Sequence, residues 1–187
     1  YNGFARGGAN LQGEQKEKYR ELSQKLSLLT LQFSENCLKE TNDYLKVITD
    51  STLLSGLPES AITAAKETAQ EKGVEGWAFT LHAPSYVPVM TYADNRDLRK
   101  EIYMAYNTQC THDNEYNNLD VVKELANTRM EVAQLLGYKD YASYMLEDRM
   151  AQNSEAVYNL LNQLLDAYTP TAKKEFAAKY GHEPKIY

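Results

Sequence analysis

The sequence feature that most constrains the fold is a one-sided apolar stripe in the first third of the chain. Its members recur at steps of three and four residues, which is the spacing of one face of an α-helix. They are Tyr19, Leu22, Leu26, Leu29 and Phe33. A helix from about Gln12 to Leu38 is roughly 40 Å long at ~1.5 Å per residue. Because so long an apolar face needs a partner, we expect the stripe to drive homodimers of the isolated chain.

Start and stop signals predict further helices along the rest of the chain. The signals are Pro58 and Gly73, Asp94, Asn117 or Asn118 with Gly137, Asp140, and Asn153 or Ser154 with Gly181. In the last of these helices, Thr169 and Pro170 either kink the helix or restart it. Most of the chain is therefore predicted to be helical.

Residues 44–92 interrupt the helical pattern. Residues 44–50 are rich in β-branched side chains, which fits a short strand or the tail of the first helix. Trp77, Phe79 and Leu81 alternate with smaller residues, and residues 87–91 could pair with them as a hairpin at about 76–92. We therefore predict a mainly all-α fold, an antiparallel multi-helix bundle with a small hairpin or a two-to-three-stranded insertion around residues 44–92.

Composition excludes some classes of partner. The 187 residues carry a net charge of −6 with no basic stripe, which argues against nucleic acid. No apolar run approaches the ~20 residues that span a bilayer, and the opening lacks a signal-peptide pattern, so no membrane partner is expected. The chain lacks a starting Met and a terminal cap. We expect residues 1–187 to be one helical fragment of a longer protein, most simply a cytoplasmic one, with periplasmic or secreted locations left open.

The potential metal ligands are few and scattered. Cys37 and Cys110 do not form a C-x-x-C pair, which favours two reduced core thiols over a disulfide. None of His82, His112 and His182 has a His or Cys at metal-ligand spacing. We expect His82 to be an ordinary strand histidine, and His112 with Asp113 offers too few ligands for a loop metal site.

The last residues, "GHEPKIY", contain a His-Glu pair that begins like the zinc-peptidase signature His-Glu-x-x-His. That signature places two histidines four residues apart on a helix, with the Glu as general base. Ile186 stands where the second His is needed, and Pro184 disfavours helical geometry at Glu183. The pair His182-Glu183 is therefore not this motif.

Two other motifs suggest packing more than chemistry. The glycines of "ARGGAN" lack the Lys-Ser/Thr of a phosphate loop, so we expect a backbone turn packed closely against a neighbour and anchored by Arg6. Tyr138, Tyr141 and Tyr144 recur every three residues. They could line a peptide groove, or pack two helices together, and the second interpretation is favoured.

Taken in order, several segments resemble one enzyme family. They are "FARGGANL", "LSLLTLQFSENCL", "GLPESAI", "EGWAFTLHAPSYVPVMTYADNRDLR", "DNEYNN", "AQLLGYKDYASYMLEDRMA" and "VYNLL". The series resembles the zinc metallopeptidases of the thimet oligopeptidase family. The Arg-Gly-Gly-Ala-Asn opening, "DNEY" and "GWAFTLH" look most like the bacterial peptidyl-dipeptidase branch, and "SYVPVMTY" is similar to the oligopeptidase A branch.

The resemblance implies a parent enzyme whose catalytic parts are not in this sequence. The family uses His-Glu-x-x-His, a third zinc-binding Glu, and later His and Tyr residues, none of which matches a position here. No catalytic or metal residue is predicted, and substrate-binding residues stay undetermined. The resemblance implies that the parent uses zinc to hydrolyse short peptides and releases C-terminal dipeptides, with endo-acting cleavage of the oligopeptidase A type as the alternative within the family. This fragment would form channel wall and scaffold. The rival prediction is a free-standing helical interaction module without enzymatic activity.

Overall fold

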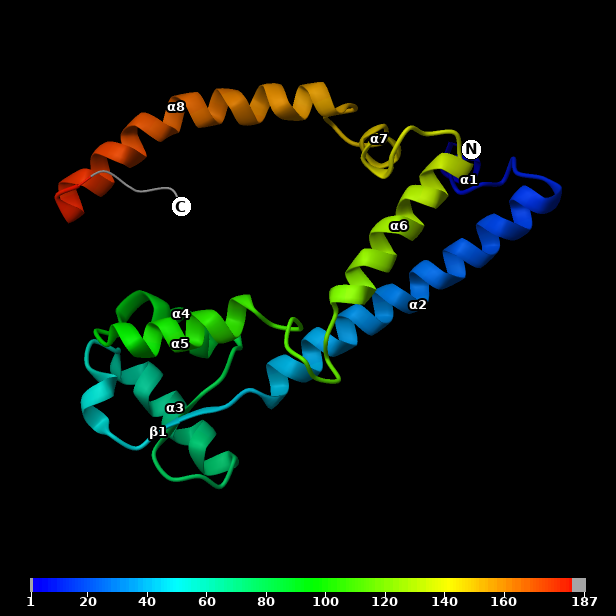
Figure 1. Ribbon diagram of the computed structural model, residues 1–187. Coiled ribbons are helices and arrows are strands. Elements are labelled where there is room, and N and C mark those ends of the chain that lie inside the picture. The colour runs from blue at the N-terminus through cyan, green and yellow to red at the C-terminus, as the bar shows by residue number, and fades with distance from the viewer. Residues whose placement is uncertain (1, 183–187) are drawn as a thin grey trace. The chain divides into compact units, whose positions relative to one another are not determined.

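The computed structural model describes residues 2–182 (Figure 1). The chain divides into two compact units. The first unit comprises Tyr1–Ser23 and Thr128–Tyr187, and the second unit comprises Gln24–Asn127. The elements in chain order are α1 (Asn2–Arg6), α2 (Gly13–Asp43), β1 (Lys46–Ile48), the 3₁₀ helix η1 (Ser51–Leu54), α3 (Glu59–Glu71), β2 (Trp77–Phe79), α4 (Ala83–Tyr92), α5 (Arg96–Asn107), α6 (Leu119–Leu135), α7 (Tyr141–Leu146) and α8 (Ser154–Tyr180). The predicted mainly helical fold with a small β element is confirmed. No helix within residues 2–182 is long and apolar enough to cross a bilayer.

Helix α2 is the long helix that the apolar stripe predicts. It extends to Asp43, five residues beyond the expected end at Leu38, since no glycine or proline interrupts the sequence between them. In the second unit its stripe is covered by α6: Leu29 packs against Val121 and Leu125. Part of the stripe thus finds its partner within the chain, because a helix distant in sequence folds back on it. The homodimer expected from this stripe stays a prediction.

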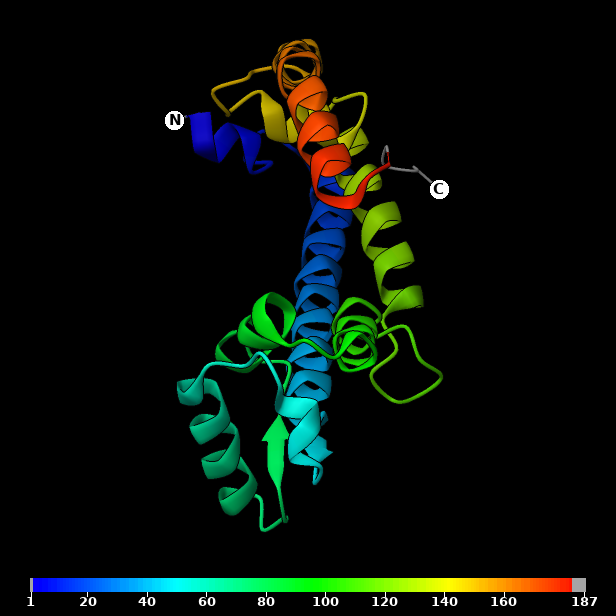
Figure 2. The ribbon, with the colours of Figure 1, turned by 90° about the vertical axis from the view of Figure 1, so that its left-hand side faces the viewer.

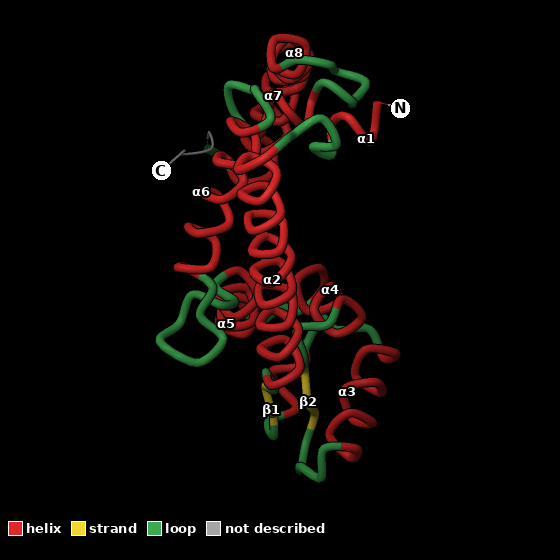
Figure 3. The backbone as a smooth tube through the Cα atoms, turned by 90° about the vertical axis from the view of Figure 1, so that its right-hand side faces the viewer, coloured by secondary structure: helices red, strands yellow, loops and turns green. Residues whose placement is uncertain are grey.

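The β element is an antiparallel pair formed by two distant segments. β1 pairs with β2 so that Lys46 lies opposite Phe79 and Ile48 opposite Trp77. Figure 3 shows the two strands side by side, and Figure 2 shows α3 running beside β2. The segment at residues 44–50 is thus a strand and not the tail of α2.

The predicted second strand at residues 87–91 is wrong, because this segment belongs to α4. Two causes explain the difference. Pro84 lies in the first turn of α4, where a missing N–H costs no helical hydrogen bond. In addition, β2 pairs with β1, which takes the place that the hairpin prediction gave to residues 87–91. A short apolar run fits either structure when read from sequence alone.

The main core of the second unit lies between the sheet and helices α3, α4 and α5. Phe79, Val89 and Ile102 are almost completely buried. The other buried members are Ile48, Leu54, Leu57, Ala65, Leu81, Ala93 and Leu98. The core thus joins both strands to three helices that follow α2 in the sequence.

Most helix ends agree with the local signals. The side chains of Asp140 and Asn153 accept the backbone N–H groups of Ser143 and Ala156, and Gly181 ends α8 in the left-handed conformation, all as predicted. α8 continues through Pro170 without restarting. The predicted cap Asp94 is wrong: Asn95 caps α5 through the N–H of Leu98, because Asp94 instead accepts a hydrogen bond from Ser55.

Candidate functional site

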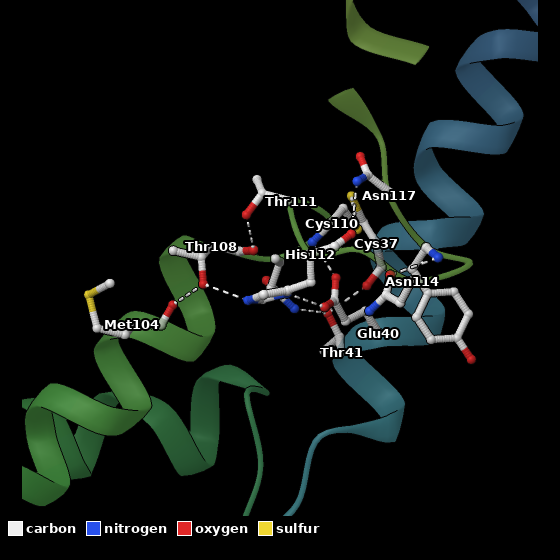
Figure 4. Close-up of polar contacts among 12 residues, drawn as sticks. Cys37, Glu40, Thr41, Met104, Thr108, Cys110, Thr111, His112, Asn114 and Asn117 are labelled. Carbon is white, nitrogen blue, oxygen red and sulfur yellow. Dashed lines mark hydrogen bonds and ion pairs between the residues drawn. The ribbon is translucent and has the colours of Figure 1, made fainter. Parts of the chain in front are cut away.

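A polar cluster in the second unit joins the last turns of α2 to the loop between α5 and α6 (Figure 4). Cys37, Glu40 and Thr41 lie three and four residues apart, which places them on one face of α2. The facing loop, residues 108–118, begins at Thr108, the C-cap of α5. Residues about 70 positions apart in the sequence thus meet at this cluster.

The loop backbone is fixed at Cys110, which has a φ of 58°. This left-handed conformation is uncommon for a residue with a side chain. It is held from both sides, since the N–H of Cys110 donates to Glu40 Oε2 and its carbonyl accepts the N–H of Asn118 at 2.8 Å. A second tie lies further along the loop, where Tyr116 Oη donates to Asp43 Oδ2 at 2.5 Å.

Glu40 is the acceptor at the centre of the cluster. Only 14% of its side chain is exposed, and its Oε1 lies 3.0 Å from Nδ1 of His112. Burial by itself raises the pKa of this carboxyl, but the Cys110 N–H and the His112 ring outweigh burial and hold the pKa below its ordinary value. Glu40 is therefore a carboxylate that stabilises the loop.

His112 uses both ring nitrogens within the cluster. Nδ1 contacts Glu40, and Nε2 lies 3.3 Å from Thr108 Oγ1, which also donates to the carbonyl of Met104. Neither nitrogen is left for a metal ion. The ring instead bridges α2 to the end of α5.

The two cysteines lie together as free thiols, as predicted. Their sulfur atoms are 3.7 Å apart, with Cys110 buried and Cys37 half-buried. Burial, followed by the hydrogen bonds to Glu40 and Cys37, raises the pKa of the Cys110 thiol to about 12. Cys110 is therefore protonated at neutral pH and is no activated nucleophile.

A hollow of about 510 Å³ opens beside this cluster. It is lined by Glu40, Tyr44, Leu81, Met104, Ala105, Thr108, Thr111 and His112. The lining is mixed, with polar side chains such as Glu40 and His112 and apolar ones such as Leu81 and Met104, and the size suits a small ligand or a single side chain. Within the described residues, the buried hydroxyl of Tyr44 has no hydrogen-bond partner.

The other histidines lie in unrelated settings. His82 occupies the position before α4, not a strand, and borders a smaller hollow of about 150 Å³ with Thr80 and Ser85. His182 packs edge-on against Phe176, while Glu183, Pro184 and Ile186 of the His-Glu segment lie outside the described residues. Across residues 2–182, no three His, Cys, Asp or Glu side chains are grouped so as to hold a metal ion.

In the first unit, Arg6 anchors the glycine turn as predicted. Its guanidinium donates to the carbonyl of Tyr144 at 2.5 Å, pairs with Glu147, and lies 4.8 Å from the ring centre of Tyr144. Gly8 has a φ of 79°, and a Cβ there would lie 3.1 Å from the Tyr19 ring. Tyr138 and Tyr144 pack edge to face, with ring centres 5.1 Å apart, which supports packing as the role of these tyrosines.

The sequence match decides the family to which this arrangement belongs. Residues 89–185 match the profile of Peptidase family M3. The matched range contains the 108–118 loop and helices α5 to α8. The chain belongs to peptidase family M3. The family-level prediction is thus confirmed.

The M3 chain aligns along almost its whole length with curated M3 relatives. It is 39% identical to oligopeptidase A of Haemophilus influenzae, over 98% of this chain and 28% of the relative. It is 40% identical to oligopeptidase A of Escherichia coli, over 93% of this chain and 26% of the relative. It is 28% identical to dipeptidyl carboxypeptidase of Escherichia coli, over 94% of this chain and 26% of the relative. The chain therefore spans about a quarter of the length of these relatives.

The central residue of the polar cluster was missed by sequence analysis. Glu40 was not singled out, and Cys37, Cys110 and His112 were each weighed separately. The i, i+3 spacing of Cys37 and Glu40 was the one available signal, because it puts a thiol and a carboxylate on one helix face. Nothing in the local sequence connects that face to a loop 70 residues away.

Proposed function

We propose that this M3 chain is a non-catalytic helical part of a zinc metallopeptidase that hydrolyses short peptides. The observation that carries the proposal is the coverage: 93–98% of the chain aligns with only 26–28% of each oligopeptidase A relative. About three quarters of such an enzyme therefore lies in other sequence. The zinc motif implied by the family resemblance belongs to that remainder.

The donor groups in the described part support this division. A catalytic zinc site takes three protein ligands and leaves one position for water. His112 has both nitrogens engaged, Cys110 holds its proton, and residues 2–182 bring no three ligands together. These residues do not supply the ligand set of a catalytic zinc site. We therefore place the zinc ligands that activate water in the parent enzyme outside this chain.

The role proposed for residues 1–187 is that of wall and scaffold. None of the described residues of the 27-residue helix α8 is buried, yet it carries many exposed apolar side chains. They are Tyr158, Leu160, Leu161, Leu164, Leu165, Tyr168 and Tyr180. A helix of this kind gains its stability from packing, so the remaining domains of the same protein are its proposed partner.

The mode of cleavage is proposed from the relatives. The identity to oligopeptidase A, 39–41%, exceeds the 28% to dipeptidyl carboxypeptidase. Endo-acting cleavage of short peptides is therefore favoured, with release of C-terminal dipeptides as the alternative. A cytosolic location is proposed on the same basis, since one relative at 36% identity is named probable cytosolic oligopeptidase A of Arabidopsis thaliana.

A free-standing helical interaction module is the second candidate. Its support is the same exposed apolar face of α8, which suits a partner protein as well as a missing domain. The gene sequence beyond Tyr187 separates the two candidates. His-Glu-x-x-His in the same reading frame supports the peptidase part, and a stop codon after Tyr187 supports the module.

The direct test is an assay of the purified chain with quenched fluorescent peptides and a zinc measurement. We expect no cleavage and less than one zinc per chain. When the rest of the enzyme is produced separately and mixed with the chain, the mixture should show peptidase activity that neither part has alone. Cleavage by the chain alone, or one tightly held zinc per chain, contradicts the proposal.

A further inference from the structure

The two thiols of the polar cluster are placed as a pair that can be oxidised. Their sulfur atoms lie 3.7 Å apart, and a disulfide needs about 2.05 Å. Forming the bond therefore requires the two sulfur atoms to approach each other by about 1.7 Å. Glu40 and Asn118 hold the N–H and the carbonyl of Cys110, so we expect the approach to come from rotation of the two side chains.

We propose that Cys37 and Cys110 are a modification site, which a low-molecular-weight disulfide such as oxidised glutathione converts into an intramolecular disulfide. The two thiols lose two protons and two electrons, and a sulfur–sulfur bond forms between them. The sulfur–sulfur bond of glutathione breaks, takes up both electrons, and leaves two glutathione thiols. The inference does not depend on the proposed peptidase role.

The order of the two exchange steps follows from exposure. Cys37 is half-buried and reachable, so its thiolate attacks first and forms a mixed disulfide with glutathione. Cys110 then attacks the Cys37 sulfur and releases the second glutathione. The second step is the slower one, because the raised pKa of Cys110 keeps its thiolate scarce.

The cross-link ties the loop of residues 108–118 covalently to α2, beside the 510 Å³ hollow. The two cysteines are 73 positions apart, so the bond closes a long loop in the unfolded chain. Closing such a loop stabilises a folded protein. The oxidised chain should therefore melt higher than the reduced chain, by about 5 °C or more.

The primary test incubates the reduced 187-residue chain with oxidised glutathione and follows intact mass and non-reducing peptide maps. We expect a final product lighter by two hydrogens, with the peptides of Cys37 and Cys110 joined. In the variant Cys110→Ser, a stable glutathione adduct on Cys37 should accumulate instead. The proposal is overturned if the unmodified chain ends as a stable glutathione adduct. It is also overturned if the final product is a disulfide between two chains.

A second measurement does not depend on oxidation. Phenylarsine oxide binds two neighbouring thiols through one arsenic and releases one water. We expect one arsenic per unmodified chain and at least a tenfold weaker uptake by Cys37→Ser and Cys110→Ser. Circular dichroism shows whether each variant is folded. Equal arsenic uptake by the folded single variants contradicts the paired site.

Discussion

At the scale of single residues, Glu40 decides how the 108–118 loop is held. Its carboxylate accepts the N–H of a residue with left-handed backbone and faces the His112 ring. Hydrogen bonds to a charged partner contribute about 1.5–3 kcal/mol. Exposed pairs on the same helix, such as Lys39 with Glu35, contribute about 0–1 kcal/mol.

The first prediction replaces Glu40 by Gln. The amide oxygen still accepts the Cys110 N–H, but the charge is lost, so the free energy of unfolding should fall by about 1 kcal/mol at pH 7. Urea denaturation followed by circular dichroism measures it. The matched control is Glu35→Gln on the exposed face of α2, which should change stability by less than about 0.5 kcal/mol.

The second prediction is the pH dependence of that difference. Because the pKa of Glu40 is lower when folded than when unfolded, its ionisation adds stability that is complete above the ordinary pKa of about 4.5. This stability is lost as the pH falls through the lower folded value. The gap between the unmodified chain and Glu40→Gln should therefore shrink as the pH falls below about 4.5. A gap that widens between pH 4.5 and pH 3 would contradict this sign.

The third prediction concerns Arg6, which is only 18% exposed in its side chain. In Arg6→Lys the charge is kept, but a single ammonium group cannot contact the Tyr144 carbonyl and Glu147 together as the planar guanidinium does. The free energy of unfolding should therefore fall by about 1–2 kcal/mol. Hydrogen exchange at residues 138–147 should also quicken. Arg20→Lys, at a 68% exposed position, is the control and should leave both measurements unchanged. Equal effects at both positions would remove the anchoring role.

At the scale of elements, two glycines show how the β pair is connected. Gly73 and Gly76 follow α3 and precede β2, and their φ angles are 68° and 97°. A Cβ on Gly76 would lie 2.1 Å from the carbonyl oxygen of Ile48, the last residue of β1. A Cβ on Gly73 would meet nothing within 4 Å. The close approach of the two strand ends thus depends on Gly76.

The fourth prediction separates steric contact from backbone strain at this turn. Gly73→Ala should cost about 1–2 kcal/mol, since only the left-handed conformation opposes it. Gly76→Ala should cost at least about 2 kcal/mol more, because the β1 backbone must also move. Thermal unfolding of the two variants gives the comparison. Similar losses at both positions would mean that the approach to Ile48 is not tight.

Elements were predictable from sequence where the deciding contacts are local. The Asp140 and Asn153 caps and the Gly181 stop act on residues within one turn, so the sequence predicts them correctly. The strand partner of β2 and the cover of α2 were missed, because β1 and α6 lie far away in the chain. The Glu40 cluster was missed for the same reason, since its members are about 70 positions apart.

At the scale of the whole molecule, apolar side chains remain uncovered in the described part. The expected dimer face was Leu22, Leu26 and Leu29, but Leu22 and Leu29 are buried. We expect the exposed apolar face of α8 to take that role instead. Its members Leu161, Leu164 and Tyr168 recur at steps of three and four, which is one face of the helix. An M3 chain that spans a quarter of its relatives therefore carries a surface suited to burial.

The last prediction tests whether this face of α8 mediates self-association of the isolated chain. We expect self-association in sedimentation velocity, and the double variant Leu161→Lys with Leu164→Lys should weaken it at least about tenfold, because each buried Leu contributes roughly 1.5–3 kcal/mol. Asn159→Lys with Gln163→Lys adds the same charge on the opposite, exposed face of α8 and is the matched control. The control should associate like the unmodified chain. If the unmodified chain stays monomeric at high concentration, or if both double variants lose self-association equally, this face of α8 does not mediate it.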